Sequence, residues 1–319
     1  MCTISVVVPV YRSGQSLDEL YRRLITSLEL ISEDFEMIFV EDCGGDNSWA
    51  IISNLAAKDR RVKGIQLSRN FGQHAATICG ISKSKGTWVI TLDDDLEHQP
   101  EYIPDLYKKA LEGYSLVYGV YSERTHSGWR NVTSQIARKL FSLAIPSLNY
   151  EYTSFRVIHY NIAHALAGFE SPFPFVDGYL SWLTNSYSTV EVQHSPRAHG
   201  GSNYNFRKLL THTINIFVTF SDVPLRISSW IGLMSFLIGM VSVAFIVFYR
   251  LIGGITVSGF ASLMAGIVLF GGIQLLVLGV IGTYLGRMNF TSSQKPLYLV
   301  SRETAAEPRP ITFLTSAKK

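Results

Sequence analysis

The chain has 319 residues, with 28 Lys and Arg against 25 Asp and Glu, so its formal net charge is +3. Hydrophobic residues make up 47% and charged residues only 17%, against about 25% charged in an ordinary soluble domain. This composition excludes a disordered chain. A net charge of +3 over this length does not indicate nucleic-acid binding. The low fraction of charged residues predicts either a very large core or membrane segments.

The N-terminal two thirds alternates short apolar runs with helix-like segments. The predicted strands are Ile4–Val10, Phe35–Val40, Val62–Leu67, Trp88–Leu92 and Leu116–Val120, and the predicted helices are 16–31, 47–58, 72–84 and 101–112. Such alternation predicts an α/β domain with a Rossmann-like, mainly parallel sheet and helices on both faces. The strands are rich in Val and Ile throughout, as expected where both faces of a sheet are covered.

Cysteine usage and the N-terminus indicate the compartment. Cys2, Cys43 and Cys79 are far apart and form no CxxC pair, which argues against a disulfide framework and a structural zinc site. The sequence Met1-Cys2-Thr3-Ile4 runs directly into a predicted strand without a basic region or a long apolar region. No signal peptide is visible, so we expect the N-terminal part to be cytosolic.

Acidic residues follow two of the predicted strands. Glu41 and Asp42 follow the second strand, and Asp93, Asp94 and Asp95 follow the fourth. Ligands of parallel sheets bind beyond the carboxyl ends of the strands. There, a carboxylate can accept hydrogen bonds from a base or a ribose, and an Asp-x-Asp pair can hold a divalent cation against a diphosphate. The alternative is that these residues form turns and helix caps. No GxGxxG or P-loop motif is present at the first turn.

Uncharged stretches dominate the C-terminal third. No charged residue occurs between Arg226 and Arg250 or between Arg250 and Arg287, and each gap can hold a membrane helix of about 20 residues. We predict a transmembrane hairpin over 227–287, with helices at about 228–248 and 260–285. The alternative is a helical pair buried in a soluble core. Arg226, Arg287 and Lys295 place the basic flanks on the cytosolic side.

Two segments border this hairpin. Residues 203–226 mix polar and apolar side chains, which suits amphipathic helices in the membrane interface or a plain surface helix of the domain. The predicted domains are therefore a catalytic domain over 1–202, interfacial helices over 203–226, the hairpin, and a cytosolic tail over 288–319.

The ordered motifs resemble family 2 glycosyltransferases of the GT-A fold. More narrowly, they resemble polyisoprenyl-phosphate glycosyltransferases of the dolichol-phosphate mannose synthase type and bacterial undecaprenyl-phosphate relatives with a C-terminal membrane hairpin. The resemblance covers about 4–300. The matching stretches are VVVPVYRSGQSLDEL, VEDCGGDNSW, LSRNFGQHAATICGI, ITLDDDLEHQPEYIP, SFRVIHYNIAHAL, RAHGGSNYNFRKLL and GVIGTYLGR followed by KPLYLV.

The resemblance implies roles for individual residues. It implies a nucleotide pocket formed by Pro9, Tyr11, Glu41, Asp42, Arg69, Asn70 and Asp94. It implies that Asp93 and Asp95 bind a Mg²⁺ or Mn²⁺ ion and the donor diphosphate, with Glu97 joining the metal. It places Arg156, Arg197 and Ser202 where the family handles acceptor phosphates, which suits the bidentate geometry of a guanidinium.

Several positions depart from the family pattern, and they leave open an altered donor or acceptor. The departures are Arg12-Ser13 for Asn-Glu, Glu41-Asp42 for Asp-Asp, Cys43-Gly44 for Gly-Ser, Asp177 for a basic residue, Asn203 for Lys and Thr283 for Glu. A hydroxyl acceptor needs a carboxylate base, and Asp177 is the candidate. Its alternative role is a helix cap or an ion-pair partner.

The resulting functional hypothesis is an inverting enzyme of the cell envelope. It moves one sugar from a nucleotide-sugar donor, with a UDP-sugar favoured, to a polyisoprenyl phosphate in the cytoplasmic membrane. The catalytic domain and both termini are expected in the cytosol. One alternative is transfer to a hydroxyl of a glycan or lipid-linked saccharide, and another is a catalytically degenerate membrane scaffold. The spacing of Gly282 and Gly286 would also permit helix packing in a homo-oligomer.

Overall fold

The computed structural model describes residues 3–121, 151–169, 174–193, 221, 223–252, 259–292 and 296–304. The strands are β1 (Ile4–Val10), β2 (Phe35–Glu41), β3 (Val62–Leu67), β4 (Trp88–Thr91), β5 (Leu116–Tyr121), β6 (Arg156–His159), β7 (Tyr187–Val192) and β8 (Val300–Glu303). The helices are α1 (Leu17–Glu29), α2 (Ser48–Lys58), α3 (Gln73–Lys83), the short η1 (Pro100–Tyr102), α4 (Ile103–Leu111), α6 (Tyr160–Ala167), α7 (Val176–Leu183), α9 (Val223–Leu251) and α10 (Phe260–Ser292).

Within these ranges the strands form one eight-stranded sheet in the order β7-β5-β6-β4-β1-β2-β3-β8. β1 pairs in parallel with β2 and β4, and β2 pairs in parallel with β3. β6 and β8 run antiparallel to their neighbours. The predicted α/β class with a mainly parallel sheet is therefore confirmed, and the carboxyl ends of β1 to β4 share one edge.

Two apolar layers cover the sheet. Every residue of β1 and β2 is buried, as two-sided coverage requires. One core cluster contains residues of α3, α6 and α7, and the other contains residues of α1, α2 and α4. Helix α1 illustrates the cause, because Leu17, Leu20, Leu24 and Leu28 recur at helical spacing and are all buried.

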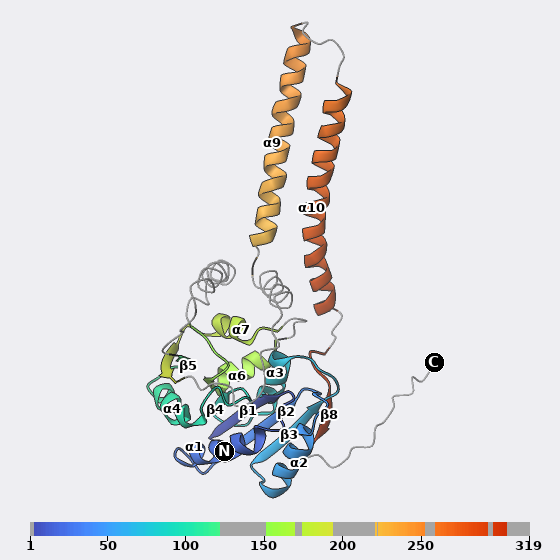
Figure 1. Cartoon of the computed structure of the whole chain (residues 1–319). Coiled ribbons are helices and arrows are strands. Elements are labelled where there is room, and N and C mark those ends of the chain that lie inside the picture. The colour runs from blue at the N-terminus through green and yellow to red at the C-terminus, as the bar shows by residue number, and fades with distance from the viewer. Residues whose placement is uncertain are drawn as a thin grey trace, which may run out of the picture.

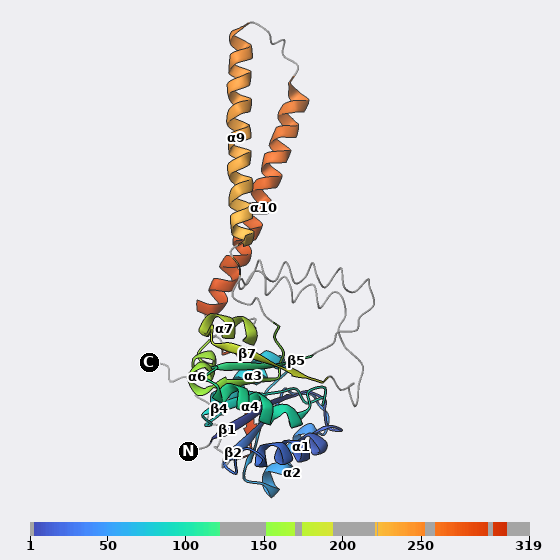
Figure 2. The same cartoon turned by 90° about the vertical axis from the view of Figure 1, so that its left-hand side faces the viewer.

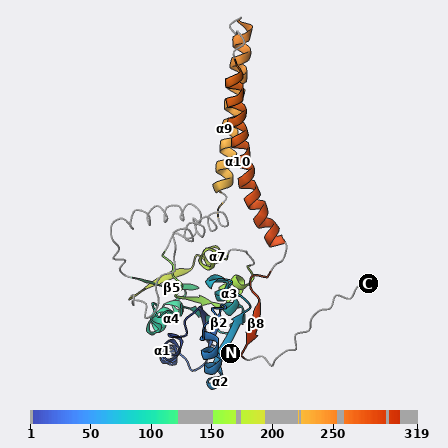
Figure 3. The same cartoon turned by 45° about the vertical axis from the view of Figure 1, so that its right-hand side comes forward.

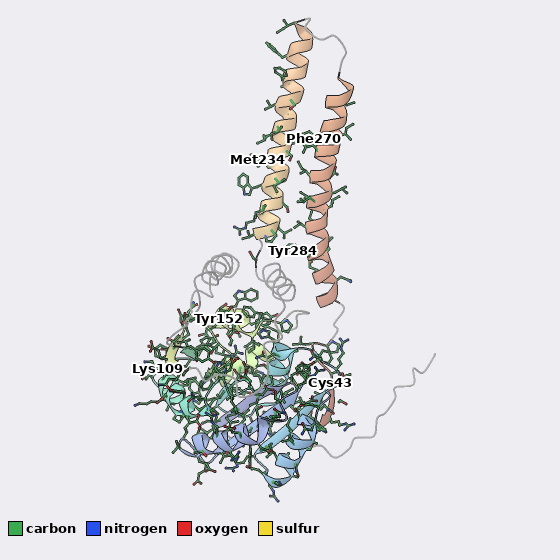
Figure 4. The ribbon with its side chains drawn as sticks, in the orientation of Figure 1. Cys43, Lys109, Tyr152, Met234, Phe270 and Tyr284 are labelled. Atoms are coloured by element: carbon green, nitrogen blue, oxygen red, sulfur yellow. The ribbon has the colours of Figure 1, made fainter. Side chains whose placement is uncertain are left out.

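The two long helices project from the domain on the side of α3, α6 and α7 (Figures 1 and 2). They contain candidate membrane spans at Val223–Ser242 and Leu269–Gly286, of which 6% and 0% are buried. Such exposure contradicts the alternative of a helical pair buried in a soluble core. At the domain end of the pair, the Tyr284 hydroxyl donates a hydrogen bond to the carbonyl of Ser221 at 2.8 Å (Figure 4).

The segment 288–319 contains structure that we do not predict from sequence. Helix α10 continues to Ser292, and β8 then joins the sheet beside β3 (Figure 3). A four-residue strand with two exposed side chains carries no periodic signal. The predicted amphipathic helices at 203–226 lie outside the described residues, apart from Ser221 and the first turn of α9.

Gly80 of α3 provides a test of the packing of this helix on β1. A Cβ atom at this position would lie 2.3 Å from Val7 Cγ1. We expect Gly80→Ala to lower the free energy of unfolding by about 1–3 kcal/mol through overpacking, although alanine gains about 1 kcal/mol in helix propensity. Thermal unfolding of the full chain in detergent measures the change.

Gly168→Ala is the matched control for this substitution. Among the described residues, a Cβ atom there, at the end of α6, meets only the Ala165 carbonyl oxygen at 3.4 Å. This control should unfold close to the wild-type temperature. Equal unfolding temperatures for both variants would contradict the packing argument.

Candidate active site

Strained backbone gathers at the carboxyl edge of the sheet. Arg12, Cys43 and Leu96 have φ values of 58°, 54° and 63°, and they are the non-glycine residues with positive φ in the described part of the chain. Each lies in a loop that follows β1, β2 or β4. Residues held in this region of φ cost free energy and concentrate at functional sites. The strain therefore indicates the same edge as the acidic motifs.

Asp93 and Asp95 follow β4 and lie in a partly buried environment. The Asp93 carboxylate accepts hydrogen bonds from Gln73 Nε2 and Ser154 Oγ, each at 2.6 Å. Asp95 Oδ1 accepts one from the backbone amide of Glu97 at 3.1 Å. Helix α3 and the segment before β6 thus orient the first carboxylate, while the second is oriented within its own loop.

Burial makes this acidic loop electrostatically unfavourable without a cation. Burial raises the pKa of Asp93, and the nearby charge of Asp95 raises it further, while His98 and Ser154 oppose the shift. Burial also raises the pKa of Asp94 to about 6. These carboxylates fit a divalent cation, which would compensate their desolvation.

The described residues do not form a complete cation site. They contain no group of three His, Cys, Asp or Glu side chains that could hold a metal ion. The expected set of Asp93, Asp95 and Glu97 is therefore not assembled as three ligands. Mg²⁺ is commonly held by one or two carboxylates plus substrate phosphates, so a donor diphosphate would have to supply the remaining oxygen ligands.

Glu41 and Asp42, at the end of β2, are both buried. Glu41 accepts hydrogen bonds from the Gly44 amide at 2.6 Å and from Gln66 Nε2 at 2.9 Å. Asp42 accepts from the amides of Phe71 and Gly72 at 2.7 and 2.8 Å. Burial raises the pKa of Asp42, and these two amides oppose the shift. Glu41 therefore fixes the loop that follows β2, and Asp42 fixes the backbone just before α3.

The remaining predicted nucleotide residues surround this edge with different exposure. Pro9 is buried in β1, whereas Tyr11 is 42% exposed and its amide donates to Asp94 Oδ2 at 2.9 Å. Arg69 and Asn70 are exposed in the loop after β3, and the Arg69 guanidinium lies 4.7 Å from the centre of the Phe71 ring. Tyr11 and Arg69 therefore offer accessible flat groups for a nucleotide.

Arg156 and Asp177 form a buried ion pair. They are 2% and 4% exposed, and Arg156 NH1 contacts Asp177 Oδ1. Arg156 Nε donates to Thr91 Oγ1 at 2.8 Å, and the Tyr118 hydroxyl donates to Asp177 at 3.2 Å. The pairing matches the alternative role of Asp177 as an ion-pair partner. It leaves neither group exposed to an acceptor in this structure.

Two predicted acceptor residues, Arg197 and Ser202, lie outside the described residues. The contacts instead reveal residues that the motifs do not single out. Gln73 and Ser154 orient Asp93, and His98 is 4% exposed with Nδ1 4.0 Å from Asp93 Oδ2. His98 directly follows Glu97, so the acidic motif indicates its neighbourhood, whereas no sequence signal links Gln73 or Ser154 to Asp93.

Comparisons with known proteins agree with this geometry. A family model described as glycosyl transferase family 2 matches residues 5–173. The chain is 31% identical to the uncharacterized glycosyltransferase YkcC of Bacillus subtilis, covering 95% of this chain and 94% of that protein. It is 32% identical to the undecaprenyl-phosphate 4-deoxy-4-formamido-L-arabinose transferase of Pseudomonas aeruginosa, covering 96% and 91%.

Solved structures resemble the fold more distantly. Glucosyl-3-phosphoglycerate synthase from Mycobacterium tuberculosis, solved with Mn²⁺, UDP-glucose and phosphoglyceric acid, matches with a TM-score of 0.50 at 19% identity, covering 69% of this chain and 78% of that chain. This likeness concerns the fold alone. Together, the comparisons confirm the GT-A-like class and the resemblance stated from the motifs.

The buried pair generates a test of the role of Asp177. We expect Asp177→Asn to lower the free energy of unfolding by about 3–5 kcal/mol, because it leaves the Arg156 guanidinium buried without a carboxylate. Glu112→Gln is the control, since it breaks the exposed Lys109–Glu112 pair and should leave the free energy of unfolding close to that of the wild type. Chemical denaturation measures both. Wild-type stability with a selective loss of turnover would instead identify Asp177 as a catalytic base.

Proposed function

The chain belongs to glycosyl transferase family 2, and we propose that it transfers one sugar, with inversion, from a nucleotide-sugar donor to a polyisoprenyl phosphate of the undecaprenyl type. The observation that carries this proposal is the combination of the carboxylate-rich sheet edge with two exposed apolar helices in one chain. The Pseudomonas relative, whose name specifies undecaprenyl phosphate, supports the acceptor class. The products would serve a cell-envelope glycan or lipid modification.

The donor would lie across the carboxyl edge of the sheet. Tyr11 and Arg69 would contact the nucleotide, and Asp93 and Asp95 would hold a Mg²⁺ or Mn²⁺ ion. The ion would supply positive charge to the departing diphosphate. The solved neighbour from Mycobacterium tuberculosis contains Mn²⁺ and UDP-glucose, which favours a UDP-sugar here. Gln73 and Ser154 would keep the Asp93 carboxylate in place as the donor binds.

The burial of Asp177 supports a phosphate acceptor. A hydroxyl acceptor requires a base within hydrogen-bond reach, whereas Asp177 is paired with Arg156 in the interior. A phosphate monoester is already anionic near neutral pH, so it requires positioning rather than deprotonation. This favours the lipid phosphate over the hydroxyl alternative. Arg197 and Ser202 remain the proposed phosphate contacts, and Arg156 would act on the site only through its buried partners.

The membrane arrangement is a proposal that rests on the chain path. β7 precedes the two apolar helices and β8 follows them, and both strands belong to the same sheet. This chain path supports a hairpin with two crossings, which would return the chain to the side of the bilayer that it left. We place the domain and both termini on the cytosolic side of the cytoplasmic membrane, consistent with the basic flank at Arg226. A Cβ atom at Gly282 or Gly286 would meet no described residue, which leaves room for contacts in a homo-oligomer.

Asp95→Ala tests the cation assignment. We expect turnover to fall by at least about 100-fold, because the cation and the departing diphosphate lose a carboxylate, while the unfolding temperature stays near that of the wild type. Sugar transfer and Mn²⁺ binding should be measured on the full chain. Asp105→Ala removes an exposed carboxylate of α4 and should change neither. Unchanged turnover in Asp95→Ala would overturn the assignment.

A radiolabelled donor distinguishes the two acceptor classes. Membranes containing the enzyme and undecaprenyl phosphate should yield an acid-labile labelled lipid, because a sugar on a phosphate is readily hydrolysed by acid. The Asp95→Ala variant is the negative control in the same membranes. Label that is found only in an acid-stable product would support transfer to a hydroxyl and contradict the proposed lipid phosphate.

A further inference from the structure

Residues 296–304 form a strap that returns from α10 to the edge of the sheet (Figure 3). Its strand, β8, pairs with β3, and the register shifts between Gln66 and Leu67. Two further hydrogen bonds join the strap to Gly64 of β3 and to Ser68, the residue that follows β3. The Ser68 amide donates to the Leu299 carbonyl at 2.8 Å, and the Gly64 amide donates to Thr304 Oγ1 at 2.9 Å. The strap is thus hydrogen-bonded along β3 as far as Ser68, where the loop after β3 begins.

The strap also contacts α3, the helix that follows β3 in the chain. The Tyr298 hydroxyl lies 2.9 Å from Ser82 Oγ, and Lys83 Nζ lies 2.8 Å from Glu303 Oε1. Tyr298 packs against the core cluster that contains Cys79, and burial raises the pKa of the Cys79 thiol to about 12. The contact between the strap and α3 is therefore apolar around Cys79, and it is polar at Ser82 and Lys83, at the C-terminal end of the helix.

Residues 68–72 join the end of β3 to the start of α3 and reach the proposed donor site. The bond from the Ser68 amide to Leu299 lies at this loop, whereas the contacts of Ser82 and Lys83 lie at the opposite end of α3. Its Phe71 and Gly72 amides bind the Asp42 carboxylate, and its Arg69 side chain is exposed. Gly72 has a φ of 92°, a conformation that glycine adopts at little cost. The loop geometry thus depends on the positions of β3 and α3. The strap bonds to β3 beside the loop and to α3 at its C-terminal end, so it fixes the two elements relative to each other.

We propose that the strap positions the donor pocket by holding β3 and α3 on either side of loop 68–72, so that Arg69 and the Asp42 contacts are preorganised for the nucleotide. This inference rests on the proposed function, because it concerns the same donor site. Preorganisation lowers the ordering cost of binding. The strap residues act as positioning residues, and the chain that leaves the apolar hairpin becomes part of the support for nucleotide binding.

An alternative explanation is that β8 merely covers the edge of β3. Unpaired edge strands promote aggregation, and proteins often cover them. A covering role would affect stability and solubility and would leave the nucleotide affinity of the folded protein unchanged. The two explanations therefore differ in the dissociation constant for UDP, measured on folded protein.

The experiment combines Tyr298→Phe with Thr304→Val in the full chain in detergent or nanodiscs. The pair removes the hydroxyl contact with Ser82 and the acceptor for the Gly64 amide. We expect the dissociation constant for UDP with Mn²⁺ to rise by about fivefold or more, as loss of two modest hydrogen bonds permits. The donor KM should rise similarly, while kcat at saturating donor stays within about twofold, since the carboxylates at Asp93 and Asp95 are untouched.

Two further variants control for nonspecific effects. Tyr21→Phe removes a hydroxyl that bonds to Asp59 Oδ2 at 3.0 Å, in α1 and away from loop 68–72, and it should bind UDP as the wild type does. Thr304→Ser, combined with native Tyr298, retains the hydroxyl and should also retain the affinity. If the double variant does not fold, Tyr298→Phe alone is compared with Tyr21→Phe.

The outcomes separate the inference from the proposed function. Wild-type UDP affinity in a folded strap variant overturns the inference and leaves the proposed function standing. A wild-type protein that binds neither UDP nor any other nucleotide with Mn²⁺ overturns the proposed function, and the inference with it. A selective rise in the UDP dissociation constant that is absent from both controls supports the positioning role.

Discussion

The buried guanidinium of Arg156 holds three elements of the domain together. Arg156 lies on β6 in the interior, where an unpaired charge is very costly, so its partners must come from neighbouring elements. Asp177 of α7 supplies the carboxylate, and Thr91 of β4 accepts the Nε–H. Three elements from distant parts of the sequence are therefore held in one arrangement. Because Thr91 precedes the acidic loop and Ser154 precedes Arg156, the same arrangement brings Ser154 to Asp93.

Partly buried charges also shape the carboxyl edge of the sheet. Several carboxylates are drawn partly out of water there, and backbone amides, Ser154 and Gln73 donate hydrogen bonds to them. A bound cation would compensate the remaining electrostatic cost, and a nucleotide could use the exposed Tyr11 and Arg69. The loops that carry these groups adopt positive φ at Arg12, Cys43 and Leu96, so the site combines electrostatic and conformational strain.

In the proposed function, the two apolar helices hold the domain close to a lipid acceptor. The helices leave the domain on the side of α3, α6 and α7, and Tyr152, which packs against Phe175 just before α7, lies on that side as well (Figure 4). A polyisoprenyl chain remains in the bilayer, so an enzyme that uses its phosphate must hold its site near the headgroups. The strap connects the apolar helices to the donor site, since it follows α10 and supports loop 68–72.

Features with local causes could be predicted from the amino-acid sequence. Val-rich and Ile-rich runs predicted the first five strands, and the two uncharged stretches on either side of Arg250 predicted the two apolar helices. The ordered motifs indicated the acidic edge. The pairing of buried charged groups became visible only in the folded structure. The motifs could not show that Asp177 is bound to Arg156, or that residues near 300 complete the sheet beside β3. These outcomes depend on contacts between distant residues, for which periodicity and composition carry no signal.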